Sequence, residues 1–276
     1  MTKATRKIGL GVMGFADLLI QLKVAYNTEK ARLIGETIMA SIKKWSDSES
    51  LKLAEYRGTF PAWNQSTLNK TDERYRNHCR LTVAPTGTIS MIADTSSGIE
   101  PTFALSWKKQ NILDGQSVNY VNKYFEKDAK EHGFYSEGLM SYLAEGGSLS
   151  KAPDHFNVPL WAKNIYATSP EISPKDHVLM QSAFQKHVDS GISKTINFPN
   201  NASISDVEEA YILAWSKKCK GITVYRAGSR EKEVMVKGSK EEGIQSSFAF
   251  PLSEEDSQDI IYSVSYTHIR AHETRE

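Results

Sequence analysis

Cysteine is scarce in this chain of 276 residues, which has only Cys79 and Cys219. Two cysteines cannot build a disulfide framework, and they fit a protein that stays in a reducing compartment. The sequence also has no apolar run close to the ~20 residues needed to span a bilayer, and its N-terminus lacks the apolar core of a signal peptide. These absences favour a cytoplasmic protein.

A strong charge of one sign is also missing. The formal net charge is +1, and no long run of lysine and arginine occurs. Nucleic-acid arms and membrane-surface patches draw their affinity from clustered cations, so neither kind of partner is expected. With 39% hydrophobic and 24% charged residues, the composition is that of a globular protein.

Apolar residues recur at helical spacing in several stretches. Asn27 is expected to cap a helix that ends near Gly58, with an apolar stripe that faces a core. A further helix is indicated by Val118, Val121 and Phe125. The stripe of the first helix consists of Ala31, Ile34, Ile38, Ile42 and Trp45.

Two later helices have clear start signals. Ser173 and Pro174 open the first, which Gly191 is expected to end, and a capping box from Ser205 to Glu208 opens the second. The apolar side of the first helix carries Met180, Ala183, Phe184 and Val188. The apolar face of the second consists of Val207, Ala210, Tyr211, Ala214 and Trp215.

The second of these helices lies between two short extended runs, residues 195–198 and 222–225. A strand, a helix and a strand in this order favour parallel pairing with a right-handed crossover. A strand that leads on from Arg80 and another near Ile8 extend the pattern. The sequence therefore predicts an α/β fold.

Residues 84–90 have the pattern of a phosphate cradle. Leu81 and Val83 suit an extended segment, and Thr88 or Ser90 is expected to start a helix whose free N–H groups bind an anion. The loop carries no lysine, unlike a Walker loop, so neutral donors would hold the phosphate. An ordinary helix-capping turn is the alternative. The residues expected to bind substrate are Ala84, Pro85, Thr86, Gly87, Thr88, Ile89 and Ser90.

Gly9, Gly11 and Gly14 match the dinucleotide-binding pattern GxGxxG. A Rossmann fingerprint follows a buried strand and leads through one helix to a second strand with an acidic end ~20 residues on. Here only Ile8 precedes the glycines, and a second helix with Glu29 follows. We interpret the glycines as positions of close backbone approach in a strand and a turn.

Four segments in order resemble one family. They read RKIGLGVMGFADLL (6–19), RLTVAPTGTISMIADTSSGIEPTFAL (80–105), SKTINFPNN (193–201) and KCKGITVYRAGSR (218–230). Together they resemble the adenosylcobalamin-dependent (class II) ribonucleotide reductases, from about residue 5 to about residue 234. The resemblance implies a ten-stranded α/β barrel, of which this chain would supply the C-terminal half.

The implied activity is ribonucleoside-diphosphate reduction to deoxyribonucleotides by a thiyl radical, with adenosylcobalamin as cofactor. The full-length enzyme would use a thioredoxin-type reductant and could form a homodimer. Two alternatives remain at this point: the large subunit of an iron-dependent ribonucleotide reductase, which uses the same barrel, and a non-catalytic phosphate-binding α/β module.

By the same resemblance, Asn197, Phe198 and Pro199 are expected to contact the cofactor or the substrate, with simple turn formation as the alternative. The family's radical cysteine is expected upstream of Met1. Cys79 and Cys219 each precede a strand and are interpreted as structural thiols, and no CxxC pair follows Arg230. The chain alone is therefore expected to be inactive.

Other polar residues have less specific interpretations. Glu100 precedes a proline and either reaches a substrate hydroxyl or forms a structural ion pair. Arg226 ends the last strand and is a candidate phosphate partner. Surface or capping roles are expected for five histidines without shared spacing, and no metal site is expected. They are His78, His132, His155, His177 and His187.

The resemblance divides the chain into residues 1–236, a partial barrel domain, and residues 237–263, a loose polar tail. Residues 264–276 look like a non-native, adapter-derived extension, and His268 and His272 within it are a weak alternative metal pair. Half a barrel leaves an open edge strand, so we expect poor solubility for the isolated chain.

Overall fold

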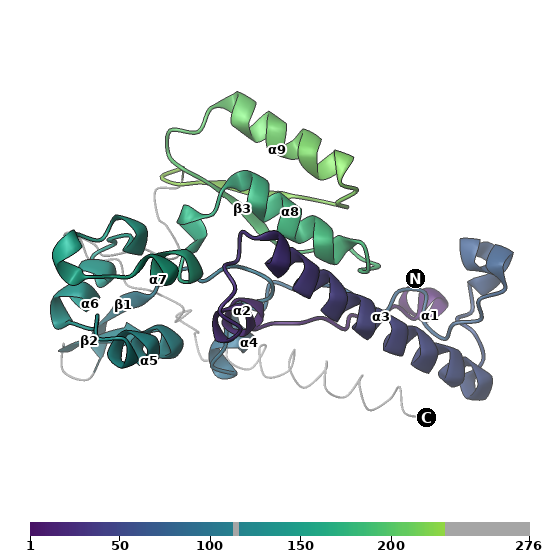
Figure 1. Ribbon diagram of the computed structural model, residues 1–276. Helices are drawn as coiled ribbons and strands as arrows, with labels where there is room; N and C mark the ends of the chain where they lie inside the picture. Colours follow the sequence, from purple (N-terminus) through teal and green to yellow (C-terminus); the bar gives the residue numbers. More distant parts are fainter. Residues whose placement is uncertain (113–115, 230–276) are drawn as a thin grey trace, which may run out of the picture. The chain divides into compact units, whose positions relative to one another are not determined.

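A computed structural model describes residues 1–112 and 116–229 of the chain (Figure 1). All of them belong to the first of two units, Met1–Gly238. The expected tail and extension, residues 237–263 and 264–276, lie outside the described residues. Among the helices that are described, none is both long enough and apolar enough to cross a membrane.

Helices and strands follow one another along the chain in mixed order. The α-helices are α1 (Thr2–Thr5), α2 (Phe15–Gln21), α3 (Glu29–Arg57), α4 (Gly87–Ile92), α5 (Lys123–Glu131), α6 (Glu137–Ala144), α7 (Leu160–Ile165), α8 (Pro174–Gln185) and α9 (Ile204–Ser216). The strands are β1 (Ser106–Ile112), β2 (Gln116–Val121), β3 (Thr195–Phe198) and β4 (Thr223–Arg226). Short 3-10 helices span Trp63–Gln65, Thr67–Thr71, Leu149–Lys151, Asp154–Phe156 and Ser169–Glu171.

Extended segments pair in parallel in the order in which they occur along the chain. Leu10 bridges to Leu81, and Val83 bridges to Ile192. β3 then pairs with β4 in parallel, from Thr195 opposite Thr223 onward. Helices connect the successive segments, as a parallel arrangement requires. The predicted α/β pattern and the parallel strand-helix-strand unit are confirmed.

The glycines near the N-terminus lie against the neighbouring extended segment. A Cβ atom on Gly9 would come within 2.8 Å of the Thr82 side chain, and one on Gly11 within 2.4 Å of the Thr82 carbonyl oxygen. Gly14 has a φ of +80°, which side chains disfavour. The interpretation of these glycines as points of close approach in a strand and a turn is confirmed.

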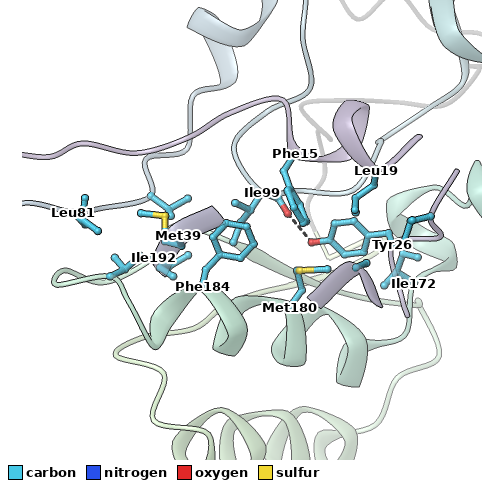
Figure 2. Close-up of a cluster of buried hydrophobic side chains, with 14 residues drawn as sticks. Phe15, Leu19, Tyr26, Met39, Leu81, Ile99, Ile172, Met180, Phe184 and Ile192 are labelled. Atoms are coloured by element: carbon cyan, nitrogen blue, oxygen red, sulfur yellow. Dashed lines mark hydrogen bonds between the residues drawn. The ribbon is translucent and has the colours of Figure 1, made fainter. Parts of the chain in front are cut away.

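The main apolar core lies where α3 and α8 pack against the parallel segments (Figure 2). Phe184 of α8 meets Phe15 of α2 edge to face, with ring centroids 5.0 Å apart. Gly35 lets α3 approach, since a Cβ there would lie 2.4 Å from the Phe184 ring. The Tyr26 hydroxyl donates to the Ile99 carbonyl oxygen at 2.6 Å inside this core.

Helix α3 differs from its prediction at two points. Its N-cap is Thr28, whose hydroxyl accepts from the Ala31 amide at 3.2 Å, so the expected cap at Asn27 is wrong by one residue. Trp45 is 68% exposed, and the stripe therefore leaves the core before it. The end at Gly58 is confirmed.

The helix predicted from Val118, Val121 and Phe125 is wrong. Val118 and Val121 belong to β2, which pairs with β1 in an antiparallel hairpin. A helix, α5, begins only after Asn122, whose side chain accepts from the amide of Phe125. The spacing of three and four residues was coincidental, because alternate residues share a face in a strand, whereas Val118 and Val121 lie three residues apart.

Start signals of the last two helices were partly right. Ser173 caps α8 as expected, but α8 ends at Gln185, well before Gly191. The capping box of α9 is formed by Ser203 and Asp206, two residues earlier than predicted. Buried faces follow the expected residues only in part, because Tyr211 is 50% and Trp215 81% exposed. Ala210 and Ala214 lie on the buried face of α9 and pack against β3.

Candidate functional site

The predicted site residues follow the ends of parallel segments. Residues 84–90 come after the segment that contains Val83, and Asn197 to Pro199 end β3. Arg226 ends β4, directly opposite Phe198 in the register. Parallel segments end at one edge of a sheet, and binding sites of parallel α/β folds occur at that edge.

The loop of residues 84–90 turns into α4, but not at the predicted residue. Its N-cap is Thr86, with a left-handed φ of 50°, so the expected start at Thr88 or Ser90 is wrong. Ser90 lies inside the helix, buried, and its hydroxyl donates to the Gly87 carbonyl at 3.1 Å. The amides of Gly87, Thr88 and Ile89 make no hydrogen bond with the described part of the chain.

The hydroxyl of Thr86 is occupied by the loop itself. It accepts from the Gly98 amide at 2.7 Å and lies 3.2 Å from the Ser97 hydroxyl. Ser97 in turn donates to the Pro85 carbonyl at 2.6 Å. Thr86 therefore closes the loop onto the returning chain, and only Thr88 keeps an exposed hydroxyl available in this loop.

The returning chain, residues 95–98, is held by α2. The Asp17 carboxylate accepts from the Ser96 amide at 2.7 Å and from the Thr95 hydroxyl at 2.9 Å. The Gly14 amide donates to the Ser96 carbonyl at 2.7 Å. Sequence reasoning missed Asp17, although an acidic residue in the first turn of an otherwise apolar helix was a visible signal.

Glu100 forms an ion pair with a buried lysine, Lys194. One carboxylate oxygen accepts from Lys194 Nζ at 2.6 Å, and the other accepts from the Thr195 amide at 2.6 Å. The Lys194 side chain has no exposed surface. Of the two interpretations of Glu100, the structural ion pair is the one that the structure contains. Lys194 was not singled out from the sequence, although it stands in one of the four family-like segments.

His177 is buried, so the expected surface or capping role is wrong for this histidine. Its Nδ1 lies 2.8 Å from Lys194 Nζ, and its Nε2 lies 3.1 Å from the Ser169 carbonyl oxygen. Burial, with the Lys194 charge as a smaller cause, lowers the pKa of His177 to about 3. The imidazole is therefore neutral at physiological pH.

The three residues predicted to contact the cofactor have three different environments. The Phe198 side chain is buried against Ala210 and Ala214. Asn197 lies on the other face of β3, and its Nδ2 donates to Ser169 Oγ at 2.7 Å. Pro199 is exposed. Within the described residues, no hydrogen bond joins the three to the loop of residues 84–90.

The cysteines lie apart from these strand ends. Cys79 is buried, with Sγ 3.0 Å from His78 Nδ1, and it precedes the segment that contains Leu81. Cys219 is half-buried and precedes β4, and burial raises the pKa of its thiol. Both positions suit the structural role expected from the sequence.

Other polar groupings lie elsewhere. Ligand atoms of Asp128, Glu131 and His132 come within 4.8 Å of one another. Asp128 is already bonded to Lys23 and, at 2.6 Å, to the Tyr166 hydroxyl, which makes it a structural group. An open hollow on the outer face of α3, lined by Glu36 and His187 among others, contains none of the predicted site residues.

Comparison with known sequences defines the class of this fold. The chain matches the family described as ribonucleotide reductase, barrel domain, over residues 1–75 and 71–225. It belongs to that family, as its four segments indicated.

Individual relatives narrow the likeness. The chain is 48% identical over 241 residues to a vitamin B12-dependent ribonucleoside-diphosphate reductase of Thermoplasma acidophilum, an alignment that covers 87% of this chain and 31% of the relative. It is 42% identical over 233 residues to a protein of the same name from Mycobacterium tuberculosis, covering 84% of this chain and 33% of the relative. The chain thus spans about a third of the length of these relatives.

Among solved structures, the alpha subunit of a class Id ribonucleotide reductase from Actinobacillus ureae superposes with a TM-score of 0.68. The superposition covers 82% of this chain and 40% of that chain, at 24% identity. At this identity the likeness concerns the fold.

Proposed function

We propose that this chain is part of an adenosylcobalamin-dependent ribonucleoside-diphosphate reductase, which makes deoxyribonucleotides by thiyl-radical chemistry in the cytoplasm. The family membership and the 48% identity to a relative of that name support the proposal. The structural observation that carries it is the row of exposed amides at Gly87, Thr88 and Ile89, which follows a parallel strand end.

The finer architecture we propose is the C-terminal half of a ten-stranded α/β barrel. Parallel segments in sequential order, joined by helices, support it. So does the segment nearest the N-terminus, where Ile8 is 52% and Leu10 48% exposed. Apolar side chains in an extended segment at that exposure suit a surface that further barrel strands would cover.

Substrate phosphate would be bound by the loop of residues 84–90. The amides of Gly87, Thr88 and Ile89 are free donors, the start of α4 adds a favourable dipole, and the Thr88 hydroxyl is exposed. The remaining members of the loop, Ala84, Pro85, Thr86 and Ser90, shape it through the contacts described above. No lysine is required, because neutral donors can hold a diphosphate.

Asn197 and Pro199 would contact the cofactor, while Phe198 anchors the strand end. Asn197 Nδ2 is bonded to Ser169, and its Oδ1 has no partner within the described residues, which suits the carboxamide-rich rim of a cobalamin. When bound, adenosylcobalamin would supply a radical by homolysis of its cobalt–carbon bond. Tight packing of Phe198 keeps the backbone of Asn197 in place.

We assign the radical cysteine to the part of the whole enzyme outside this chain, because Cys79 and Cys219 precede their strands and are at least half-buried. The chain alone would then be inactive. A thioredoxin-type reductant and a homodimer are proposals for the whole enzyme.

The test is thermal denaturation of this chain with a ribonucleoside diphosphate or the matching nucleoside, each at millimolar concentration. We expect the diphosphate alone to raise Tm. Gly87→Val should abolish the shift without lowering the ligand-free Tm by much, because a Cβ at Gly87 meets no neighbouring atom. Gly191→Val is the matched control, since its Cβ is also unopposed. An equal shift with the nucleoside, or in Gly87→Val, would rule out phosphate binding by this loop.

A further inference from the structure

Lys194 is a buried cation whose three N–H donors each have an acceptor. They bond to the Glu100 carboxylate at 2.6 Å, to His177 Nδ1 at 2.8 Å and to the Thr195 carbonyl at 3.1 Å. An ammonium group has three donors and no acceptor, so this environment satisfies it fully. Glu100 lies in the chain that follows the loop of residues 84–90, His177 lies in α8 and Thr195 lies in β3.

The histidine in this network has a defined tautomer. Nε2 faces the Ser169 carbonyl oxygen, which only accepts, so the ring proton resides on Nε2. Nδ1 is then the acceptor for Lys194. A protonated His177 would direct an N–H at an ammonium group, which the buried geometry forbids.

Ser169 links His177 to β3 through two hydrogen bonds. Its carbonyl accepts from His177, and its hydroxyl oxygen accepts from Asn197 Nδ2 at 2.7 Å. The amide of Asn197 is therefore turned with its nitrogen inward and its Oδ1 free to accept. Hydrogen bonds thus run from Glu100 to Lys194, to His177 and to the Ser169 carbonyl, and the hydroxyl of the same serine bonds to Asn197.

We propose that Lys194 is a positioning residue that fixes the side-chain amide of Asn197 through His177 and Ser169, and holds the chain behind the phosphate loop through Glu100. Asn197 Oδ1 then receives a neutral hydrogen-bond donor of the ligand, either a primary carboxamide or a ribose hydroxyl. The ligand in this inference rests on the proposed function, whereas the network rests on the described contacts alone.

Stability alone does not explain such a network. A buried ion pair recovers little more than its desolvation cost, and apolar replacements of similar volume are often as stable. A histidine kept neutral beside a lysine adds a further cost at acidic pH. What the network supplies that an apolar core would not is a fixed orientation of polar groups at the end of β3.

The first experiment uses the unaltered 276-residue chain without ligand. Long-range nitrogen–proton NMR spectra, with His177 assigned by its loss in His177→Gln, report the tautomer directly. We expect a neutral ring with its proton on Nε2 at pH 6. A charged ring at pH 6, or a proton on Nδ1, would overturn the proposal.

The second experiment follows the side-chain amide resonances of Asn197, assigned by Asn197→Asp. Lys194→Met should shift them, whereas Lys43→Met should not. Lys43 is a matched control because it also pairs with carboxylates, those of Asp47 and Asp189, outside the network. Should Lys194→Met fail to fold, His177→Leu breaks the path between Lys194 and Ser169, leaves the Ser169–Asn197 hydrogen bond in place and must produce the shift. Unmoved resonances in the folded variant would refute positioning.

The ligand is then identified by titration. Cobalamin and a ribonucleoside diphosphate are added separately, and the additive that perturbs the Asn197 amide is the molecule that supplies the donor. No perturbation by either would remove the ligand part of the inference. Because the first two experiments contain no ligand, failure of the network and failure of nucleotide binding are separate results.

Discussion

The Asp17 carboxylate lies against the Ser96 backbone amide, with its Oδ2 2.7 Å from the Ser96 nitrogen. The contact is reciprocal, because the Ser96 hydroxyl accepts from the Asp17 amide at 3.2 Å. Asp17 is buried to all but 6% and stands in the first turn of α2. The start of α2 and the chain that follows the loop of residues 84–90 are thus joined across 79 residues of sequence.

Removal of this carboxylate should loosen the loop. Asp17→Ala leaves the Ser96 amide and the Thr95 hydroxyl unpaired, and we expect a loss of about 1–3 kcal/mol in the free energy of unfolding. Asp17→Asn keeps one acceptor oxygen and should lose less. Urea denaturation measures both, and amide exchange at Ser96 should speed up in Asp17→Ala. Equal stability of Asp17→Ala and the unaltered chain would contradict this role.

Gly11 should not tolerate a side chain. Gly11→Ala places a Cβ 2.4 Å from the Thr82 carbonyl oxygen, a backbone atom that cannot move aside cheaply. We expect a loss of about 1–3 kcal/mol, typical of overpacking. Gly191→Ala is the control, since its Cβ has open space, and its change should stay within about 0.5 kcal/mol. Similar values for the two variants would argue against the close approach at Gly11.

His177 should make stability depend on pH. Its ordinary pKa of 6.5 applies to the unfolded chain, and its pKa in the folded chain is lowered to about 3. Between these values the unfolded state binds more protons, so stability is full above pH 6.5 and falls as the pH decreases toward 3. The slope is at most about 1.4 kcal/mol per pH unit.

Urea denaturation between pH 7 and pH 5 measures this slope above the range in which carboxylates titrate. His177→Gln should reduce it, because glutamine stays neutral while offering a donor and an acceptor. His78→Gln should reduce the slope less than His177→Gln does, because burial lowers the pKa of His78 too, but by less. A slope that is unchanged in His177→Gln would show that other groups cause it.

The sequence correctly predicted helix ends that are set by contacts within one turn. The end of α3 at Gly58 and the start of α8 at Ser173 were correct, because a glycine C-cap and a serine N-cap act within one turn. Val118 was assigned to a helix because its spacing from Val121 and Phe125 matches a helical period, although its strand partner Lys109 lies only nine residues earlier. Trp45 was placed in the core because a periodic pattern does not show where the packing surface ends.

For the candidate site, the sequence indicated the loop but not the network behind it. The turn at Pro85 and Gly87 was readable from residue types alone. Lys194 meets Glu100 94 residues away and His177 17 residues away, and neither separation follows a helix or strand period. His177 was placed at the surface because no residue near it in the sequence indicates its buried partner, Lys194.

Lys194 and Glu100 should be strongly coupled. Lys194→Met leaves the Glu100 carboxylate, only 24% exposed, without its cation, and we expect a loss of about 3 kcal/mol. Glu100→Gln leaves a buried ammonium without its counterion and should cost as much. The double variant should be more stable than the sum of the single losses allows. A double-mutant cycle by urea denaturation tests this, and additive losses would show that the two side chains act independently.

The most direct test of the proposed function places this chain in a whole enzyme. Residues 5–229 would replace the matching segment of the Thermoplasma acidophilum relative, and deoxyribonucleotide formation from a ribonucleoside diphosphate would be measured with and without adenosylcobalamin. The account predicts product only with adenosylcobalamin, and its loss in the same chimera carrying Gly87→Val. A folded chimera that binds adenosylcobalamin but forms no deoxyribonucleotide, or one that forms it equally without the cofactor, would contradict the proposed function.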